Sequence, residues 1–126
     1  METLQRSPAT LMSSTKLSNY LRTYRKRTGL SQDEVAFLLG WNSPAHLSRY
    51  EHFSRVPALR TALALAVIFQ TSARELFAGE YQKVEIAVRR QAQRLEARLA
   101  MDAADQSTGH KLDFLRLIVS ANDNHS

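Results

Sequence analysis

The sequence predicts an all-α protein, a five-helix domain followed by a C-terminal helical extension. Composition is the first observation: only four glycines and three prolines occur among 126 residues. Alanine, leucine, arginine, glutamine and glutamate are abundant, and this mix favours helices. Secondly, apolar residues recur at three- and four-residue steps, as they do on one face of a helix. Thirdly, glycines and capping residues stand where these stripes begin and end. Apolar residues make up 44% of the chain, which is enough for one buried core.

The first helix is predicted to run from near Thr15 or Lys16 to Gly29. Glycine commonly ends a helix because it adopts the left-handed conformation without a steric cost. The preceding residues, 1–14, are polar and show no periodicity, so we expect a flexible arm there. The apolar side of the helix carries Leu17, Leu21 and Tyr24.

Ser31 and Glu34 form the sharpest local signal, a capping box that starts the second helix. The Ser31 hydroxyl is expected to accept the N–H of Glu34, while the Glu34 side chain reaches back to the N–H of Ser31. Gly40 is predicted to end this helix after about two turns. Its apolar stripe consists of Val35, Leu38 and Leu39.

The turn after Gly40 contains Trp41 and Asn42, and a third helix is predicted directly behind it. Ser43 is expected to cap this helix, with Pro44 at the first helical position, where the missing N–H costs nothing. The helix should fade near His52. Its inward-facing residues are predicted to be Leu47 and Tyr50.

After a loop over residues 53–56, Pro57 is predicted to open a fourth, largely buried helix. Ser72 and Glu75 form a second capping box for a short fifth helix. Ala78 and Gly79 are expected to end it. The fourth helix is expected to bury Leu59, Leu63, Ala66, Val67 and Phe69.

A long amphipathic helix is predicted from Glu80 to Met101, followed by a linker over residues 102–109. Leu112 to Val119 is a short apolar run whose period fits both helix and strand, and we expect a helix. The chain thus divides into an arm (1–14), a five-helix domain (15–79), the long helix (80–101) and a linker with a short apolar segment (102–126). The stripe of the long helix would cover its own chain or bury against a second copy. Its members are Tyr81, Val84, Val88, Ala92, Leu95 and Leu99.

The net charge of +5 is concentrated in one third of the chain. Between Lys16 and Arg60 there are eight basic and three acidic residues, whereas the segments on either side are each balanced. A local cationic field of this kind attracts polyanions and speeds their encounter with the protein. A solvated helix face would explain the same charges without a partner.

Several classes of protein are disfavoured by the residues that are present. There is no cysteine, so disulfides and thiolate metal sites are excluded. His46, Glu51 and His52 include metal-ligand types but lack a third ligand at suitable spacing, so we expect no metal and no cofactor. The sequence shows no pattern of an activated nucleophile, a phosphate-binding glycine loop or a paired-carboxylate cluster, so we do not expect an enzyme. No apolar run reaches the length of a membrane span and the N-terminus does not resemble a signal peptide, so we expect no membrane partner and a cytoplasmic location.

Two short helices around a glycine-containing turn match the helix-turn-helix pattern, in which the second helix reads base edges in the major groove. The stretch LRTYRKRTGLSQDEVAFLLGWNSPAHLSRYE resembles the lambda-repressor/Cro (Xre-type) helix-turn-helix family. The resemblance continues through VPALRTALALAVIFQTSARELF and covers roughly residues 17–77. It implies a five-helix, lambda-repressor-like domain that binds double-stranded DNA.

The resemblance also implies roles for individual residues. Arg49 is the main candidate for base reading, because a guanidinium pairs bidentately with guanine. Arg25 and Glu51 match an ion pair that ties the first helix to the third. The implied base-reading residues are Ser43, Pro44, Ala45, His46 and Arg49. The phosphate contacts that the resemblance implies are Ser31 and Gln32, through backbone amides at a helix N-terminus and the Gln32 side chain, and His52. Arg22 and Lys26 are predicted to contact phosphate because of their charge, with a solvated helix face as the alternative, and Asn42 and Arg55 complete the predicted phosphate contacts.

Three departures from the family pattern bear on these roles. One additional residue lies between Gly40 and Glu51, so the register of the turn is less defined than that of Arg49. Pro44 and Ala45 are poor hydrogen-bond formers at reading positions, which leaves more of the recognition to DNA shape. Phe53 stands where many relatives have glycine, and we expect it to cover the core in preference to meeting a partner.

The resulting hypothesis is a sequence-specific transcriptional regulator, a repressor, that binds a pseudo-palindromic operator as a homodimer. The alternative is a protein-interaction module, such as an antitoxin or anti-regulator, that binds a protein partner through its C-terminal helices.

Overall fold

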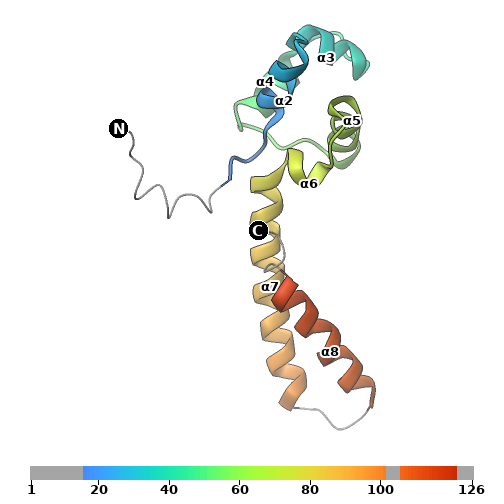
Figure 1. The fold of residues 1–126 in the computed structure, drawn as a ribbon. Coiled ribbons are helices and arrows are strands. Elements are labelled where there is room, and N and C mark those ends of the chain that lie inside the picture. Colours follow the sequence, from blue (N-terminus) through green and yellow to red (C-terminus); the bar gives the residue numbers. More distant parts are fainter. Residues whose placement is uncertain (1–15, 102–105, 122–126) are drawn as a thin grey trace, which may run out of the picture. The chain divides into compact units, whose positions relative to one another are not determined.

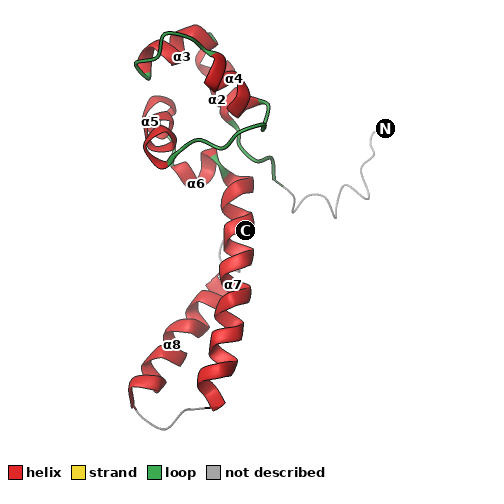
Figure 2. Ribbon diagram, turned by 180° about the vertical axis from the view of Figure 1, so that it is seen from behind, coloured by secondary structure: helices red, strands yellow, loops and turns green. Residues whose placement is uncertain are grey.

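The computed structural model describes residues 16–101 and 106–121, and within these ranges every regular element is a helix, joined by loops (Figures 1 and 2). The predicted arm over residues 1–14 lies outside them. The all-α expectation is confirmed. The chain divides into two compact units, residues 1–81 and residues 82–126. The helices are α2 (Leu21–Thr28), α3 (Gln32–Leu38), α4 (Ala45–Glu51), α5 (Leu59–Phe69), α6 (Ala73–Leu76), α7 (Ala78–Met101) and α8 (Gln106–Ser120).

Helix α2 begins at Leu21, five residues later than the predicted start at Lys16. The segment before it makes backbone hydrogen bonds to distant residues instead of helical ones. The N–H of Tyr20 donates to the carbonyl of Leu76 (2.8 Å), and the carbonyl of Leu17 accepts from the N–H of Gly79 (2.8 Å). These bonds tie the first described residues to α6 and α7, which the local sequence pattern could not indicate. Gly29 ends α2 in the left-handed conformation (φ +82°), as predicted.

The capping box at the start of α3 is confirmed. The Ser31 hydroxyl accepts from the N–H of Glu34 (3.1 Å), and the Glu34 carboxylate accepts from the N–H of Ser31 (2.8 Å). Gly40 has φ +81°, so the turn after α3 uses a conformation that favours glycine. Within the stripe predicted for this helix, Val35 is buried but Leu38 is 56% exposed.

Helix α4 begins one residue later than predicted. Pro44 is the N-cap and Ala45 is the first helical residue, while the Ser43 hydroxyl accepts from the N–H of Ala45 (3.1 Å). Ser43 therefore supports the start of the helix from one position further out. As predicted, Leu47 and Tyr50 are buried.

The prediction of a largely buried fourth helix is wrong for α5. Leu65 and Phe69 are buried, but Leu59, Leu63 and Val67 are 71%, 49% and 69% exposed. The exposed three are spaced by four residues and lie on one side of the helix, away from Leu65. Because α5 is apolar on nearly all sides, its sequence carries no period that shows which side faces the core.

Gly79 does not end a helix, as was expected, but lies in the first turn of α7. A Cβ at this position would overlap the carbonyl oxygen of Leu17, so the close approach of the two backbones requires glycine. The carbonyls of Leu17 and Ser18 accept from the N–H groups of Gly79 (2.8 Å) and Glu80 (3.3 Å). The first turn of α7 is therefore capped by backbone instead of by a side chain.

The second predicted capping box is partly confirmed. The Ser72 hydroxyl accepts from the N–H of Glu75 (3.0 Å) at the start of α6. The Glu75 carboxylate accepts from the hydroxyl of Thr71 (3.0 Å). Around these helices, the core of the first unit consists of Leu21, Val35, Leu47, Tyr50, Leu65, Phe69, Leu76 and Phe77.

In the second unit, α8 begins at Gln106, so the last four residues of the predicted linker are helical. The helix expected over residues 112–119 is confirmed. Leu112 and Leu115 are buried, as is Ala92 of α7. An ion pair joins Arg116 Nε of α8 to Glu96 Oε2 of α7 (3.1 Å). Together, residues 82–101 of α7 and α8 form a helical hairpin.

Candidate nucleic-acid interface

Helices α3 and α4 form the helix-turn-helix, and α4 has two different faces. Leu47, Tyr50 and Glu51 are buried, whereas Ala45, His46 and Arg49 are exposed. The exposed positions follow the i, i+1, i+4 spacing of one helix face. An exposed polar face opposite a firmly packed one is the form in which a helix presents side chains to base edges.

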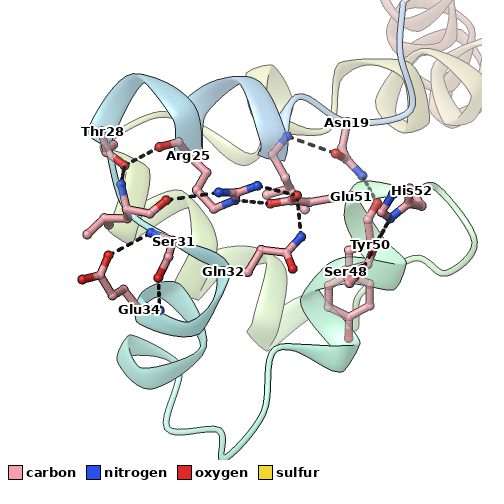
Figure 3. Close-up of polar contacts among 12 residues, drawn as sticks. Asn19, Arg25, Thr28, Ser31, Gln32, Glu34, Ser48, Tyr50, Glu51 and His52 are labelled. Carbon is pink, nitrogen blue, oxygen red and sulfur yellow. Dashed lines mark hydrogen bonds and ion pairs between the residues drawn. The ribbon is translucent and has the colours of Figure 1, made fainter.

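Glu51, the last residue of α4, is held by α2 and α3 (Figure 3). Its carboxylate oxygens accept from Arg25 Nε (2.7 Å) and Arg25 Nη2 (3.0 Å), and Oε1 also accepts from Gln32 Nε2 (2.9 Å). Arg25 Nη1 donates further to the carbonyl of Leu30 (3.2 Å). One carboxylate thus fixes the relative positions of the first three helices of the domain.

The charge state of Glu51 follows from these contacts. Burial raises the pKa of its carboxyl. Hydrogen bonds from Arg25 and Gln32, together with the positive charges of Arg25 and Arg22, more than offset this, so the pKa lies below its usual value. The hydrogen bond to Glu51 in turn raises the pKa of Arg25. Both groups are charged near neutral pH, and the pair satisfies the requirement that a buried charge be paired and hydrogen-bonded.

Arg49 is oriented by an array of rings on the surface of α4. Its Nη1 lies 3.3 Å from His46 Nδ1. The His46 ring meets the Trp41 ring edge to face (centroids 5.7 Å apart), and Trp41 also packs against Tyr50 (6.2 Å). The turn residue Trp41 therefore connects the core to the two polar side chains of the exposed face.

Several predicted phosphate-contacting residues gather around one open cleft of about 580 Å³. Arg22 and Lys26 of α2 lie on one side of it, and His52, just after α4, lies on the other. His52 Nδ1 is 2.8 Å from the carbonyl of Ser48, so this nitrogen carries the proton and Nε2 is left for another partner. Arg22, Lys26 and His52 thus border one cleft that is open to solvent, and we call it the cationic cleft.

The remaining predicted contacts are distributed differently. Asn42 and Ser43 are exposed in the turn, and Pro44 is half-buried. Arg55 lies outside the cleft, beside Val56 and Pro57. The side-chain amide of Gln32 and the backbone N–H of Ser31 are both engaged within the domain, by Glu51 and Glu34. A phosphate at the N-terminus of α3 would therefore be met by the backbone N–H groups of its first turn.

Asn19 is a contributor to the site that sequence reasoning missed. It is 5% exposed. Its Nδ2 donates to the carbonyl of Tyr50 (2.8 Å), and its Oδ1 accepts from the N–H of Leu21 (3.0 Å). It thereby starts α2 and holds the end of α4. Asparagine is a preferred residue at helix starts, and this was the available signal.

The backbone of Phe53 is in the left-handed region (φ +64°), a conformation that glycine adopts readily. This explains why many relatives carry glycine at this position. The expectation that its side chain covers the core is wrong, since it is 47% exposed and lines the edge of the cleft. The structure thus places an apolar ring beside the cationic side chains.

Across the described segments, no group of three or more histidine, cysteine, aspartate or glutamate side chains is arranged to hold a metal ion. Among the helices of residues 16–101 and 106–121, none is long and apolar enough to cross a membrane.

Residues 16–78 match the model of a helix-turn-helix domain, which spans half of the chain and includes α2 to α6. No curated protein and no solved structure matches the chain. The matched range coincides with the helices that carry the exposed face of α4 and the cationic cleft. The chain belongs to the helix-turn-helix domain family, a family of DNA-binding domains.

Proposed function

We propose that this protein is a sequence-specific transcriptional repressor that binds a pseudo-palindromic operator as a homodimer. The observation that carries the proposal is the two-faced α4: Ala45, His46 and Arg49 are exposed, while Glu51 locks the opposite face to α2 and α3. A rigidly held helix with an exposed arginine suits direct readout of a guanine. Its resemblance to the lambda-repressor/Cro family supports the repressor assignment.

In this proposal, phosphate contacts position the domain and α4 specifies the sequence. Arg22, Lys26 and His52 would meet one DNA strand through the cationic cleft, with Arg55 and Asn42 extending the contact. Arg49 would read guanine, and Ala45 would contact a thymine methyl group. Ser43, Pro44 and His46 would border the reading surface. Because few of these residues donate hydrogen bonds to bases, DNA shape would contribute to specificity.

The test is DNA binding by fluorescence anisotropy, using the sequence upstream of the protein's own gene and a random duplex, over a salt series. Arg49→Ala should weaken operator binding by about 5- to 150-fold, as loss of a bidentate guanine contact costs about 1–3 kcal/mol, and should change random-duplex binding little. Arg94→Ala is the matched control, because it removes the same charge from α7, outside the helix-turn-helix. If the two variants lose the same affinity, only charge attraction is left and base reading by Arg49 is contradicted.

Phosphate contacts are separated from base contacts by salt dependence. Arg22→Ala and Lys26→Ala should weaken binding to operator and random duplex alike, and each should reduce the slope of log affinity against log salt by about 1. Unchanged slopes in both variants would remove the cleft from the interface.

The alternative function is a protein-interaction module that binds a protein partner through residues 82–126. The observation that favours it is apolar exposure on the hairpin, where Val84, Val88 and Phe114 are 58%, 49% and 62% exposed. If the full-length protein binds neither duplex at low salt, this alternative replaces the operator-binding proposal.

A further inference from the structure

The α7–α8 hairpin has one apolar side. On α7, Val84, Val88 and Leu95 lie within a narrow arc of the helix, because their spacings of four and seven residues return to nearly the same direction. All three are exposed. On α8, Phe114 borders the same side, since Leu95 and Phe114 line one open groove of about 360 Å³. We call this set, Val84, Val88, Leu95 and Phe114, the apolar face of the hairpin.

Polar contacts join the two helices at a different edge of the hairpin. Arg116 Nε pairs with Glu96 Oε2 (3.1 Å), and Arg116 Nη1 pairs with Asp113 Oδ1 (3.4 Å). α8 packs against the edge of α7 that carries Glu96 and buried Ala92, and it leaves Val84, Val88 and Leu95 of the apolar stripe exposed. Of the large apolar side chains described in this hairpin, Leu112 and Leu115 are buried.

A hairpin of this composition is too small to bury its own apolar residues. Two helices give a single layer of contacts, whereas helical units bury apolar stripes by packing at least one further layer against them. Residues 82–101 form about 30 Å of helix, and two helices side by side are about 20 Å wide, so one face offers about 600 Å². Two such faces together bury about 1,200 Å², which reaches the lower limit of stable protein interfaces.

We propose that two copies of this chain associate through the apolar face of the α7–α8 hairpin, forming a bundle of four helices. The large side chains of this face are apolar, with Gln91 as the polar residue between Val88 and Leu95. Such a face matches itself across a two-fold axis, where each residue set meets the same set of the partner copy. The groove between Leu95 and Phe114 would receive apolar side chains of the second copy. This inference deepens the proposed operator-binding function and rests on it for its role, which is to bring two α4 helices to two half-sites.

The test compares glutamate substitutions on opposite sides of α7. Val88→Glu places a charge in the apolar face. Ile86→Glu is the matched control: Ile86 is 45% exposed and Val88 49%, but two residues correspond to about 200° of rotation. Oligomeric state is measured by sedimentation velocity over a concentration series, with helicity followed by circular dichroism. We expect a dimeric wild type, a dimeric Ile86→Glu variant, and a dimer dissociation constant raised on the order of 100-fold by Val88→Glu, because a charge would be buried without a partner.

Cysteine cross-linking keeps the test decisive if a glutamate disturbs folding. The chain contains no cysteine, so a single cysteine reports only its own position. Val88→Cys and Leu95→Cys should be joined into covalent dimers by a short bismaleimide, and Ile86→Cys should stay largely a monomer on a denaturing gel. Phe114→Glu examines the same face from α8 and should dissociate the dimer as Val88→Glu does.

Three results would overturn the inference: a monomeric wild type at all concentrations, a dimer equally stable in all glutamate variants, or equal cross-linking at positions 86, 88 and 95. These measurements contain no DNA, so they fail or succeed independently of operator binding. If Val88→Glu dissociates the dimer while the wild type binds no operator, the bundle stands and the operator-binding proposal falls. If the wild type binds the operator as a monomer, the bundle falls and DNA binding stands.

Discussion

Arg25 and Glu51 form a bidentate ion pair between α2 and the last residue of α4, with contacts of 2.7 and 3.0 Å. The Glu51 side chain is 2% exposed and that of Arg25 13%. Since Gln32 of α3 donates to the same carboxylate, three helices meet at one charge. The orientation of the exposed face of α4 therefore depends on a buried electrostatic contact as well as on apolar packing.

Removing one partner of this pair should be strongly destabilising. Glu51→Ala leaves the largely buried Arg25 guanidinium without its negative partner. Arg25→Ala leaves the buried Glu51 carboxylate without its positive partner. Each should lower the free energy of unfolding by about 3 kcal/mol. The double variant Arg25→Met/Glu51→Leu should lose clearly less than the sum of the single changes, because no unpaired charge is left. Chemical denaturation of all variants measures this, and simple additivity would contradict the account.

The pair should also make stability depend on pH on the acid side. The pKa of Glu51 is lowered in the folded protein, so its contribution is complete above the unfolded value of about 4.3 and is lost as the pH falls through the folded pKa. Glu51→Gln should flatten this part of the profile. Denaturation midpoints of wild type and variant between about pH 3 and 7 provide the comparison, and parallel profiles would show that another carboxylate is responsible.

Gly79→Ala should destabilise the first unit, whereas Gly109→Ala should not destabilise the chain. At Gly79 a methyl group overlaps the Leu17 carbonyl and separates the start of α7 from the segment before α2, whereas Gly109 in α8 faces open space. We expect a loss of about 2 kcal/mol for the first change, within the range for overpacking, and a gain of up to about 1 kcal/mol for the second from helix propensity. Thermal unfolding of the two variants is the measurement. Equal effects would mean that the close approach at Gly79 is of no consequence.

Phe53→Gly should stabilise the domain even though it deletes a large side chain. Phe53 has φ +64°, a conformation that costs a non-glycine residue about 1–3 kcal/mol, and its ring is half exposed. After the greater flexibility of glycine in the unfolded chain is subtracted, a gain of about 1 kcal/mol is expected. Arg55→Gly in the same loop is the control and should lose stability, because its backbone is outside the left-handed region. A loss of stability in Phe53→Gly would show that the ring packs more tightly than its exposure indicates.

Local signals in the sequence were sufficient for much of the first unit. Ser31 and Glu34 start α3, Gly29 and Gly40 adopt positive φ, and Leu47 and Tyr50 of α4 are buried, each as predicted. The cap and the two glycine turns depend on interactions within about four residues, so the sequence contains both partners side by side. The burial of Leu47 and Tyr50 was predicted from helical periodicity. The Arg25–Glu51 pair is nonlocal, and it was predicted only through the family resemblance. The individual DNA contacts remain predictions.

Tertiary structure decided the features that depend on contacts between segments far apart in the sequence. Gly79 was expected to end a helix, but the carbonyls of Leu17 and Ser18 cap the first turn of α7 and turn the glycine into a point of close approach. Leu59, Leu63 and Val67 were expected in the core, but only three-dimensional packing determines which side of an almost wholly apolar helix is buried. The sequence by itself determined the start of α3, the glycine turns at Gly29 and Gly40, and the inward face of α4, because short-range hydrogen bonds and periodicity set them. Which backbone groups pair across the chain, and which apolar residues stay exposed, depends on contacts between elements that no local pattern encodes.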